Sequence, residues 1–305
     1  MRISISYLYV IFKYGYPHKL KDVLKALPEI QKMGFRYLEM EGLGRELLMS
    51  LYKNRNTLVK ALGDSSLHVH NFCVVNPDLV SLDPARRNRA IDLFKVGAEI
   101  GELLGAETLH LASYAPPVQY LEAKPYQLGG KSSYKFVDQV QIRIPKGFDW
   151  NEVWNALVAS CQACADIAAQ HGKTVLMEPR IGEVICSVDS LLRLIEYVGR
   201  DNFKANFDTG HFSAQRENVV LALMKLQGRF ANIHIADNDP RNTNHLPIGK
   251  GVIDWQEFFR VLKSMNYQGY LGLDLGMSKT LPQDYRRSVE HVQAIASKLH
   301  VPIEV

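Results

Sequence analysis

The chain has 305 residues, of which 47% are hydrophobic and 22% are charged. This length suits one α/β barrel domain covering residues 1–305, and the composition is that of an ordinary globular protein. A net charge of +4 does not indicate nucleic-acid binding, and no apolar stretch is long enough to cross a bilayer. Four cysteines make no disulfide framework, and the first ten residues resemble a strand rather than a signal peptide, so we expect a cytoplasmic protein.

Strand-like and helix-like segments alternate along the chain, which is typical of βα units around a parallel sheet. Predicted strands lie near residues 2–10, 35–39, 67–73, 107–112, 173–178, 203–208, 230–235 and 269–274. Predicted helices lie near residues 19–33, 44–62, 84–104, 150–171, 187–199, 215–228, 254–265 and 282–298. Asp149 and Asp254 precede two of these helices as N-caps. Eight strands and eight helices in alternation predict a (β/α)8 TIM barrel.

One connection is far longer than the others. Residues 113–149 separate the fourth strand from the fourth helix, whereas such connections usually take a few residues. The segment contains Pro116-Pro117, Gly129-Gly130 and several aromatic residues, and the alternation over 139–144 predicts a short hairpin. In a barrel this loop emerges at the catalytic face. We therefore interpret residues 113–149 as an insertion within the barrel domain that acts as a lid or an interface.

Four acid or imidazole side chains each end a short apolar run in the C-terminal half: Glu178, Asp208, His234 and Asp274. They are 30, 26 and 40 residues apart, which is about one strand–helix unit each. Because the carboxyl ends of barrel strands meet at one mouth, these donors should surround a common point. The pattern predicts a divalent-metal site. Three carboxylates and one imidazole suit Mn²⁺, with Co²⁺, Mg²⁺ or Zn²⁺ as alternatives.

Three motifs around these residues resemble the xylose isomerase-like TIM barrels. They are Met-Glu-Pro at 177–179, Asn-Phe-Asp-Thr-Gly-His at 206–211 and Asn-Ile-His-Ile-Ala at 232–236. The pattern is close over residues 170–275 and continues more faintly into the N-terminal half. The resemblance implies a sugar isomerase or epimerase of carbohydrate metabolism. It also implies that the four strand-end residues bind one Mn²⁺ or a similar ion.

The same resemblance implies a set of substrate contacts. His211, three residues after the metal-binding aspartate, would contact substrate oxygens beside the metal. Arg241 and His245 lie in the turn after the metal-binding histidine and would join the substrate site, although Arg241 is one residue further along than in such epimerases. Together with the ligands, these positions predict a small-molecule sugar or glycoside as the substrate.

The implied chemistry is removal of a proton next to a sugar carbonyl, through an enediolate. Glu178 is the first candidate for the catalytic carboxylate. The second position holds Asp274, where the epimerases have a glutamate, so its carboxylate is set back by about 1.5 Å. His70 and His110, near the ends of the third and fourth strands, are alternative bases. Glu39 faces the same mouth and is predicted to orient a sugar hydroxyl.

Three other functions stay open. The α subunit of C-glycoside deglycosidases resembles this barrel, and such a lyase would act on 3-oxo-glucosides together with a smaller β subunit. An endonuclease IV-type nuclease would place extra ligands near His70, His110, His211 and His245, but Thr243 stands where that family's third site needs an aspartate. A non-catalytic sugar-binding barrel is the third. We expect a homo-oligomer or a complex with a β subunit, and no membrane or nucleic-acid partner.

Overall fold

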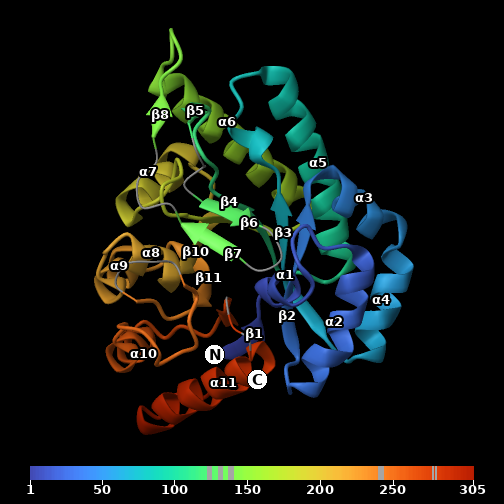
Figure 1. The fold of residues 1–305 in the computed structure, drawn as a ribbon, viewed down its shortest axis with the longest axis vertical. Coiled ribbons are helices and arrows are strands. Elements are labelled where there is room, and N and C mark those ends of the chain that lie inside the picture. Colours follow the sequence, from blue (N-terminus) through green and yellow to red (C-terminus); the bar gives the residue numbers. More distant parts are fainter. Residues whose placement is uncertain (122–125, 130–132, 137–140, 240–243, 277, 279) are drawn as a thin grey trace.

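Eight parallel strands close into a barrel surrounded by helices (Figure 1). The computed structural model describes residues 1–121, 126–129, 133–136, 141–239, 244–276, 278 and 280–305. Around the barrel the strands follow the order β1, β2, β3, β4, β9, β10, β11, β12, and β12 pairs with β1 to close the ring. This arrangement confirms the predicted (β/α)8 barrel.

The elements have the following bounds. The barrel strands are β1 (Arg2–Ile5), β2 (Tyr37–Leu43), β3 (His68–Val75), β4 (Thr108–Ala112), β9 (Thr174–Glu178), β10 (Phe203–Asp208), β11 (Phe230–Ile235) and β12 (Tyr270–Leu273). The helices are α1 (Leu8–Tyr14), α2 (Leu20–Lys32), α3 (Gly44–Lys53), α4 (Arg55–Asp64), α5 (Pro84–Leu103), α6 (Trp150–Gln170), α7 (Val188–Val198), α8 (Thr209–Ala214), α9 (Val219–Lys225), α10 (Trp255–Ser264) and α11 (Leu281–Lys298), with a 3₁₀ turn at Pro77–Val80.

Local signals explain most of these boundaries. The side chains of Asp149 and Asp254 accept backbone N–H groups of the first turns of α6 and α10, as predicted. Gly105 and Gly172 follow α5 and α6 with φ of +75° and +64°. Because only glycine adopts such angles without strain, these residues end the helices and turn the chain into the next strand.

Four predicted elements differ from the structure. The first strand ends at Ile5 rather than near residue 10, because the apolar run that follows coils into α1. The predicted helix over 44–62 is two helices that break at Asn54, and the one over 215–228 is only α9, preceded by α8. The third strand continues to Val75. Apolar runs alone could not place these ends, since strand and helix interiors are both buried here.

The apolar core lies between the strands and the surrounding helices, where side chains such as Phe72, Phe94, Phe207 and Phe258 are fully buried. The inside of the barrel is different, because its inward positions carry buried serines, asparagines, histidines and carboxylates. Buried polar groups need hydrogen-bond partners or an ion, so the barrel interior must be a connected polar network. Within the described residues, no helix is long and apolar enough to span a bilayer.

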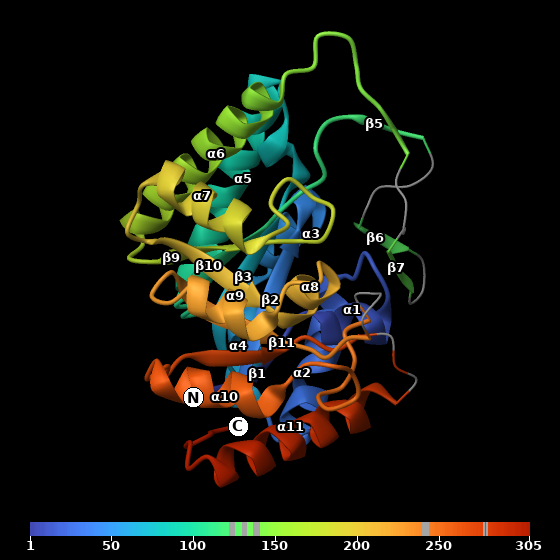
Figure 2. The same ribbon diagram turned by 90° about the vertical axis from the view of Figure 1, so that its left-hand side faces the viewer.

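The insertion between β4 and α6 carries two short antiparallel pairs. β5 (Gln119–Tyr120) pairs with β8 (Ile142–Arg143), and β6 (Tyr126–Gly129) pairs with β7 (Ser133–Phe136). Residues 139 and 140 of the predicted hairpin lie outside the described residues, whereas residues 142–143 are paired with β5. The β6–β7 hairpin stands in front of the barrel strands in Figure 1 and beyond the ends that lead to α1 and α8 in Figure 2.

Candidate active site

The four predicted ligands lie on four neighbouring strands at the mouth of the barrel. Glu178 and Asp208 are the last residues of β9 and β10, His234 is the fifth residue of β11, and Asp274 directly follows β12. Asp208 is paired in register with His234. All four side chains are buried, with exposed fractions of at most 4%. The strand-end spacing therefore brings these residues to one end of the sheet.

Three of the four form a group that could hold a metal ion. One donor atom each of Glu178, Asp208 and His234 lies within 4.8 Å of the others. His234 Nδ1 lies 2.8 Å from Glu178 Oε1 and 3.5 Å from Asp208 Oδ2. Among the described residues, His234 Nδ1 and Asp208 Oδ2 have no hydrogen-bond partner of normal geometry. Two buried atoms with free lone pairs, next to the carboxylate of Glu178, fit a bound divalent cation.

The two carboxylate oxygens of Asp208 have different contacts. Oδ1 accepts the backbone N–H of His211 at 2.9 Å and so caps the short helix α8. The cap fixes the carboxylate plane, and the other oxygen points toward His234. In the sequence Asp-Thr-Gly-His, the side chain of Asp208 therefore caps a helix and is also a candidate metal ligand.

Glu39 sets the orientation of His234. Glu39 Oε2 lies 2.7 Å from His234 Nε2, and Asn232 donates to Glu39 Oε1 at 2.9 Å. If Nε2 carries the proton and donates it in a hydrogen bond to this carboxylate, the Nδ1 lone pair faces Glu178 and Asp208. A carboxylate behind a metal-binding histidine commonly has this role. Glu39 was predicted to orient a sugar hydroxyl, but both its oxygens contact protein groups inside the barrel.

Asp274 occupies a different position from the other three. Ser6 donates to Asp274 Oδ1 at 2.5 Å, and His245 Nδ1 lies 3.0 Å from Asp274 Oδ2. His245 Nδ1 also lies 2.9 Å from the Asp274 backbone oxygen. Among the described residues, the compact group around His234 does not include Asp274. The shorter aspartate is instead held at the rim by β1 and by the loop that carries His245.

The carboxyl groups of Glu178 and Asp208 are ionised at neutral pH. Burial would raise the pKa of Glu178, but His110, His234 and Arg180 together hold this pKa well below its ordinary value. Burial also opposes ionisation of Asp208, whose pKa is nevertheless lowered by the neighbouring imidazoles. The site therefore presents permanent negative charge at the mouth.

The neighbouring negative charge also shifts the pKa of His234. Burial alone would lower its pKa, yet Glu39, Asp274, Asp208 and Glu178 raise it well above the ordinary value. In the same surroundings the pKa of Glu39 is lowered to about 2, because His234 and His70 outweigh its burial. Four carboxylates thus surround one imidazole, and this excess of negative charge is of the kind that favours a divalent cation.

The other predicted residues separate into two groups. His110 faces the ligands, with Nε2 3.7 Å from Glu178 Oε1, and the rings of His211 and His245 lie 5.6 Å apart. His70 does not lie at the mouth, because β3 runs five residues past it; its ring stacks on Tyr270 at 3.9 Å near the start of β12. The predicted position of His70 at a strand end was therefore wrong. Arg241 lies outside the described residues.

Sequence reasoning missed several residues of the site. Arg180 donates from Nε to Glu178 Oε2 at 3.0 Å, and its Nη2 lies 3.5 Å from the Tyr7 hydroxyl. Asn206 donates to Glu178 Oε1 at 2.9 Å and accepts from Asn232 at 2.8 Å. Both asparagines stand two residues before a predicted ligand, and the two-residue strand period places them on the same inward face. That signal was present in the sequence.

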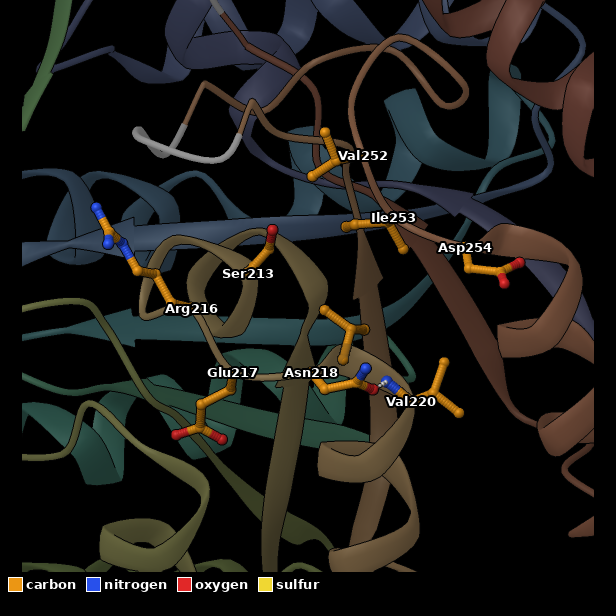
Figure 3. A pocket seen from close by; sticks show the side chains of 9 residues that line it. Ser213, Arg216, Glu217, Asn218, Val220, Val252, Ile253 and Asp254 are labelled. Carbon is orange, nitrogen blue, oxygen red and sulfur yellow. Dashed lines mark hydrogen bonds between the residues drawn. The ribbon is translucent and has the colours of Figure 1, made fainter.

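A hollow of about 660 Å³ opens elsewhere on the surface, between the α8–α9 turn and the start of α10 (Figure 3). Its lining includes Ser213, Arg216, Val252 and Asp254. None of the described residues of the predicted site lines it. The hollow is therefore a separate surface feature.

Comparison with known proteins agrees with this geometry. The family model of the xylose isomerase-like TIM barrel matches residues 27–295. The chain belongs to this family. An L-ribulose-5-phosphate 3-epimerase, UlaE of Salmonella heidelberg, is 24% identical over 255 residues, covering 81% of this chain and 79% of the relative.

Solved structures of other proteins share the fold. A D-tagatose 3-epimerase-like protein matches with a TM-score of 0.74 and 18% identity, over 98% of this chain and all of the other. The 3-keto-D-glucoside 4-epimerase YcjR from E. coli matches with a TM-score of 0.72 and 19% identity, over 96% and 99% of the two chains. The relatives are sugar epimerases, which supports an enzyme of the isomerase or epimerase kind.

Proposed function

We propose that this member of the xylose isomerase-like TIM barrel family is a divalent-metal-dependent sugar epimerase or isomerase. The observation that carries the proposal is the buried group of Glu178, Asp208 and His234 at the barrel mouth. These residues would hold Mn²⁺ or a similar ion, with Asp274 as the proposed fourth member of the site. Bound there, the ion would supply the positive charge that acidifies a C–H bond beside a sugar carbonyl.

The residues around the group are suited to move the proton. Glu178 is the proposed base, and Arg180 fixes its orientation by donating to Oε2. His110 Nε2 lies 3.7 Å from Glu178 Oε1 and has no hydrogen-bond partner among the described residues. Burial lowers the pKa of His110 to about 4, so its imidazole is neutral at neutral pH and can accept a proton. Asp274, on the far side of Asp208 and His234 from Glu178, is the candidate for the second proton-transfer group.

The substrate would enter from the face that carries the insertion. We propose the β6–β7 hairpin as a lid, because it stands in front of the barrel mouth (Figures 1 and 2).

The base of the insertion is proposed as an interface, since Ile142, Ile144 and Trp150 are 45%, 53% and 43% exposed. Replacing the hairpin with a short Gly-Ser linker should raise KM more than it lowers kcat, and Ile144→Asp should leave KM unchanged but reduce any self-association.

Proton transfer is tested by isotope exchange. The protein would be incubated in D₂O with Mn²⁺ and, in separate reactions, D-tagatose, L-ribulose 5-phosphate and a 3-keto-glucoside. We expect deuterium to enter at the carbon beside the carbonyl of at least one sugar, together with formation of its epimer or isomer, as followed by NMR. Protein that contains metal and exchanges none of these sugars would contradict the proposal.

The deglycosidase alternative begins with the same proton removal and differs in its product. A lyase would release the carbon-linked aglycone from a 3-oxo-C-glycoside, whereas an epimerase would return the proton and keep that bond. The same incubation with such a glycoside separates the two activities by chromatography of the aglycone.

A further inference from the structure

A buried acid and a buried imidazole face each other outside the metal-binding group. Glu41 lies on β2 two residues beyond Glu39, and His18 lies in the segment between α1 and α2. Each residue is 4% exposed. Glu41 Oε1 lies 3.9 Å from His18 Nδ1, and neither atom has a hydrogen-bond partner in the described part of the chain. Unsatisfied buried polar atoms are costly, so a facing pair of them calls for an explanation.

The space around this pair is the size of one water molecule. A void of about 10 Å³ is lined by both residues, by Glu39 and Tyr7, and otherwise by apolar residues such as Leu27 and Met40. This volume is about one water probe, the least that a buried water needs. Two polar atoms 3.9 Å apart are too distant for a direct hydrogen bond, but one water can bond to both.

His18 is buried, but it also borders a surface cleft. It lines a surface cleft of about 350 Å³ whose walls include Lys19, Leu43 and Glu46. His18 therefore borders both this cleft and the small void. On its inner side the void is bounded by Glu39, whose carboxylate contacts His234. The pair therefore lies between the surface cleft and the residues that surround His234.

Both members of the pair are uncharged near neutral pH. Burial raises the pKa of Glu41 to about 8, with Arg180 opposing and Glu178 reinforcing the shift. Burial lowers the pKa of His18 to about 4, although Asp22 acts in the other direction. A protonated carboxyl group is a donor and a neutral imidazole nitrogen is an acceptor, so the pair has the polarity that a relay needs.

We propose that Glu41 and His18 form a water-mediated proton relay between the reaction chamber and the surface cleft. The Glu41 O–H bond breaks as its proton passes to the bridging water, and a proton of that water passes to His18 Nδ1. His18 then releases its Nε2 proton to solvent in the cleft, and Glu41 takes up a proton from the chamber side. Protons and charge balance over one transfer, and a flip of the His18 ring restores its starting tautomer before the next one. The relay rests on the proposed function, because it exchanges the protons that the reaction moves.

Chemical rescue tests the relay during turnover in D₂O. His18→Ala should lower the deuterium incorporated per turnover by about tenfold or more, because proton exchange with solvent is interrupted. Added imidazole should restore incorporation, since it can enter the cleft and replace the missing ring. Glu41→Gln should show the same loss without rescue by imidazole, and Glu46→Gln, an exposed residue of the same cleft, should behave as wild type. Unchanged incorporation in both His18→Ala and Glu41→Gln would overturn the proposal.

A second measurement needs no substrate. Infrared spectra of the wild-type protein at pH 7 should contain a protonated-carboxyl band that is missing in Glu41→Gln. The band should shift in His18→Ala, because the bridging water loses its second partner. Absence of this band, or a band that His18→Ala leaves in place, would overturn the relay even if the sugar chemistry is confirmed. A band that behaves as expected would support the relay even if another substrate class is found.

Discussion

The two halves of the barrel mouth contribute different things. Strands β9 to β12 carry the ligand candidates, which are short-range neighbours on consecutive strand ends. The half of the chain from β1 to β4 carries the groups behind them: Glu39 orients His234, Ser6 holds Asp274, and His110 approaches Glu178. In the function proposed above, the C-terminal half would bind the ion, and the N-terminal half would orient the ligands and exchange protons.

This difference shows that a ligand set does not define a site without its supporting residues. In the C-terminal half alone, His234 would have no group to select its Nε2 tautomer. In the N-terminal half alone, the carboxylates and imidazoles would have no shared centre. Mutations in the two halves should therefore have distinguishable effects, with loss of chemistry on one side and loss of orientation on the other.

Glu178→Gln should have the largest effect. The amide cannot accept the substrate proton, so we expect turnover to fall by about 10²- to 10⁴-fold. The assay is epimer formation followed by NMR with saturating Mn²⁺. The matched control is Glu196→Gln on α7, which is exposed and should keep full activity. Wild-type rates in Glu178→Gln would remove this residue from the mechanism.

Glu39→Gln should have the next largest effect and tests the supporting half. An amide can still reach His234 but does not fix its tautomer, so Mn²⁺ affinity should fall by about 10- to 100-fold. Isothermal titration calorimetry measures the change, and Glu107→Gln outside the barrel mouth is the control. Unchanged affinity would mean that the two halves are not coupled through His234.

The sequence predicted the binding half better than the supporting half. Glu178, Asp208 and His234 could be found because each ends an apolar run inside a recognisable motif. The Ser6–Asp274 and Glu39–His234 contacts join residues 268 and 195 positions apart, and no local pattern reports such pairs. His70 was misplaced for a related reason, since the true length of β3 depends on its neighbours in the barrel.

The substitution Asp274→Asn tests whether Asp274 acts as a metal ligand or in proton transfer. Since both oxygens of Asp274 contact Ser6 and His245 rather than the His234 group, we expect nearly unchanged Mn²⁺ affinity and a clear loss of turnover. Calorimetry and the exchange assay give the two quantities. A loss of affinity as large as that of Glu39→Gln would show that Asp274 is a true fourth ligand.

The smallest expected effect concerns stability against pH at Glu41. Its pKa is about 8 in the folded protein, because burial raises it above the ordinary value of 4.5. Between these values the unfolded chain loses a proton that the folded chain keeps, so the stabilising contribution present below pH 4.5 is lost as pH rises to about 8. Glu41→Gln should therefore gain stability over wild type from pH 5 to pH 8.5 in thermal unfolding. A constant difference in stability between the two proteins across this pH range would contradict a Glu41 that is buried as a neutral acid.

The central claim is that Glu178, Asp208 and His234 together hold one divalent ion. The most direct measurement is Mn²⁺ titration by calorimetry of the wild type and of Asp208→Asn. Asparagine can keep the N-cap of α8 that Asp208 Oδ1 now makes, so the variant removes the ligand charge and spares the helix. We predict one Mn²⁺ per chain for the wild type and a large loss of affinity in the variant. Equal affinity in the two proteins would contradict the account.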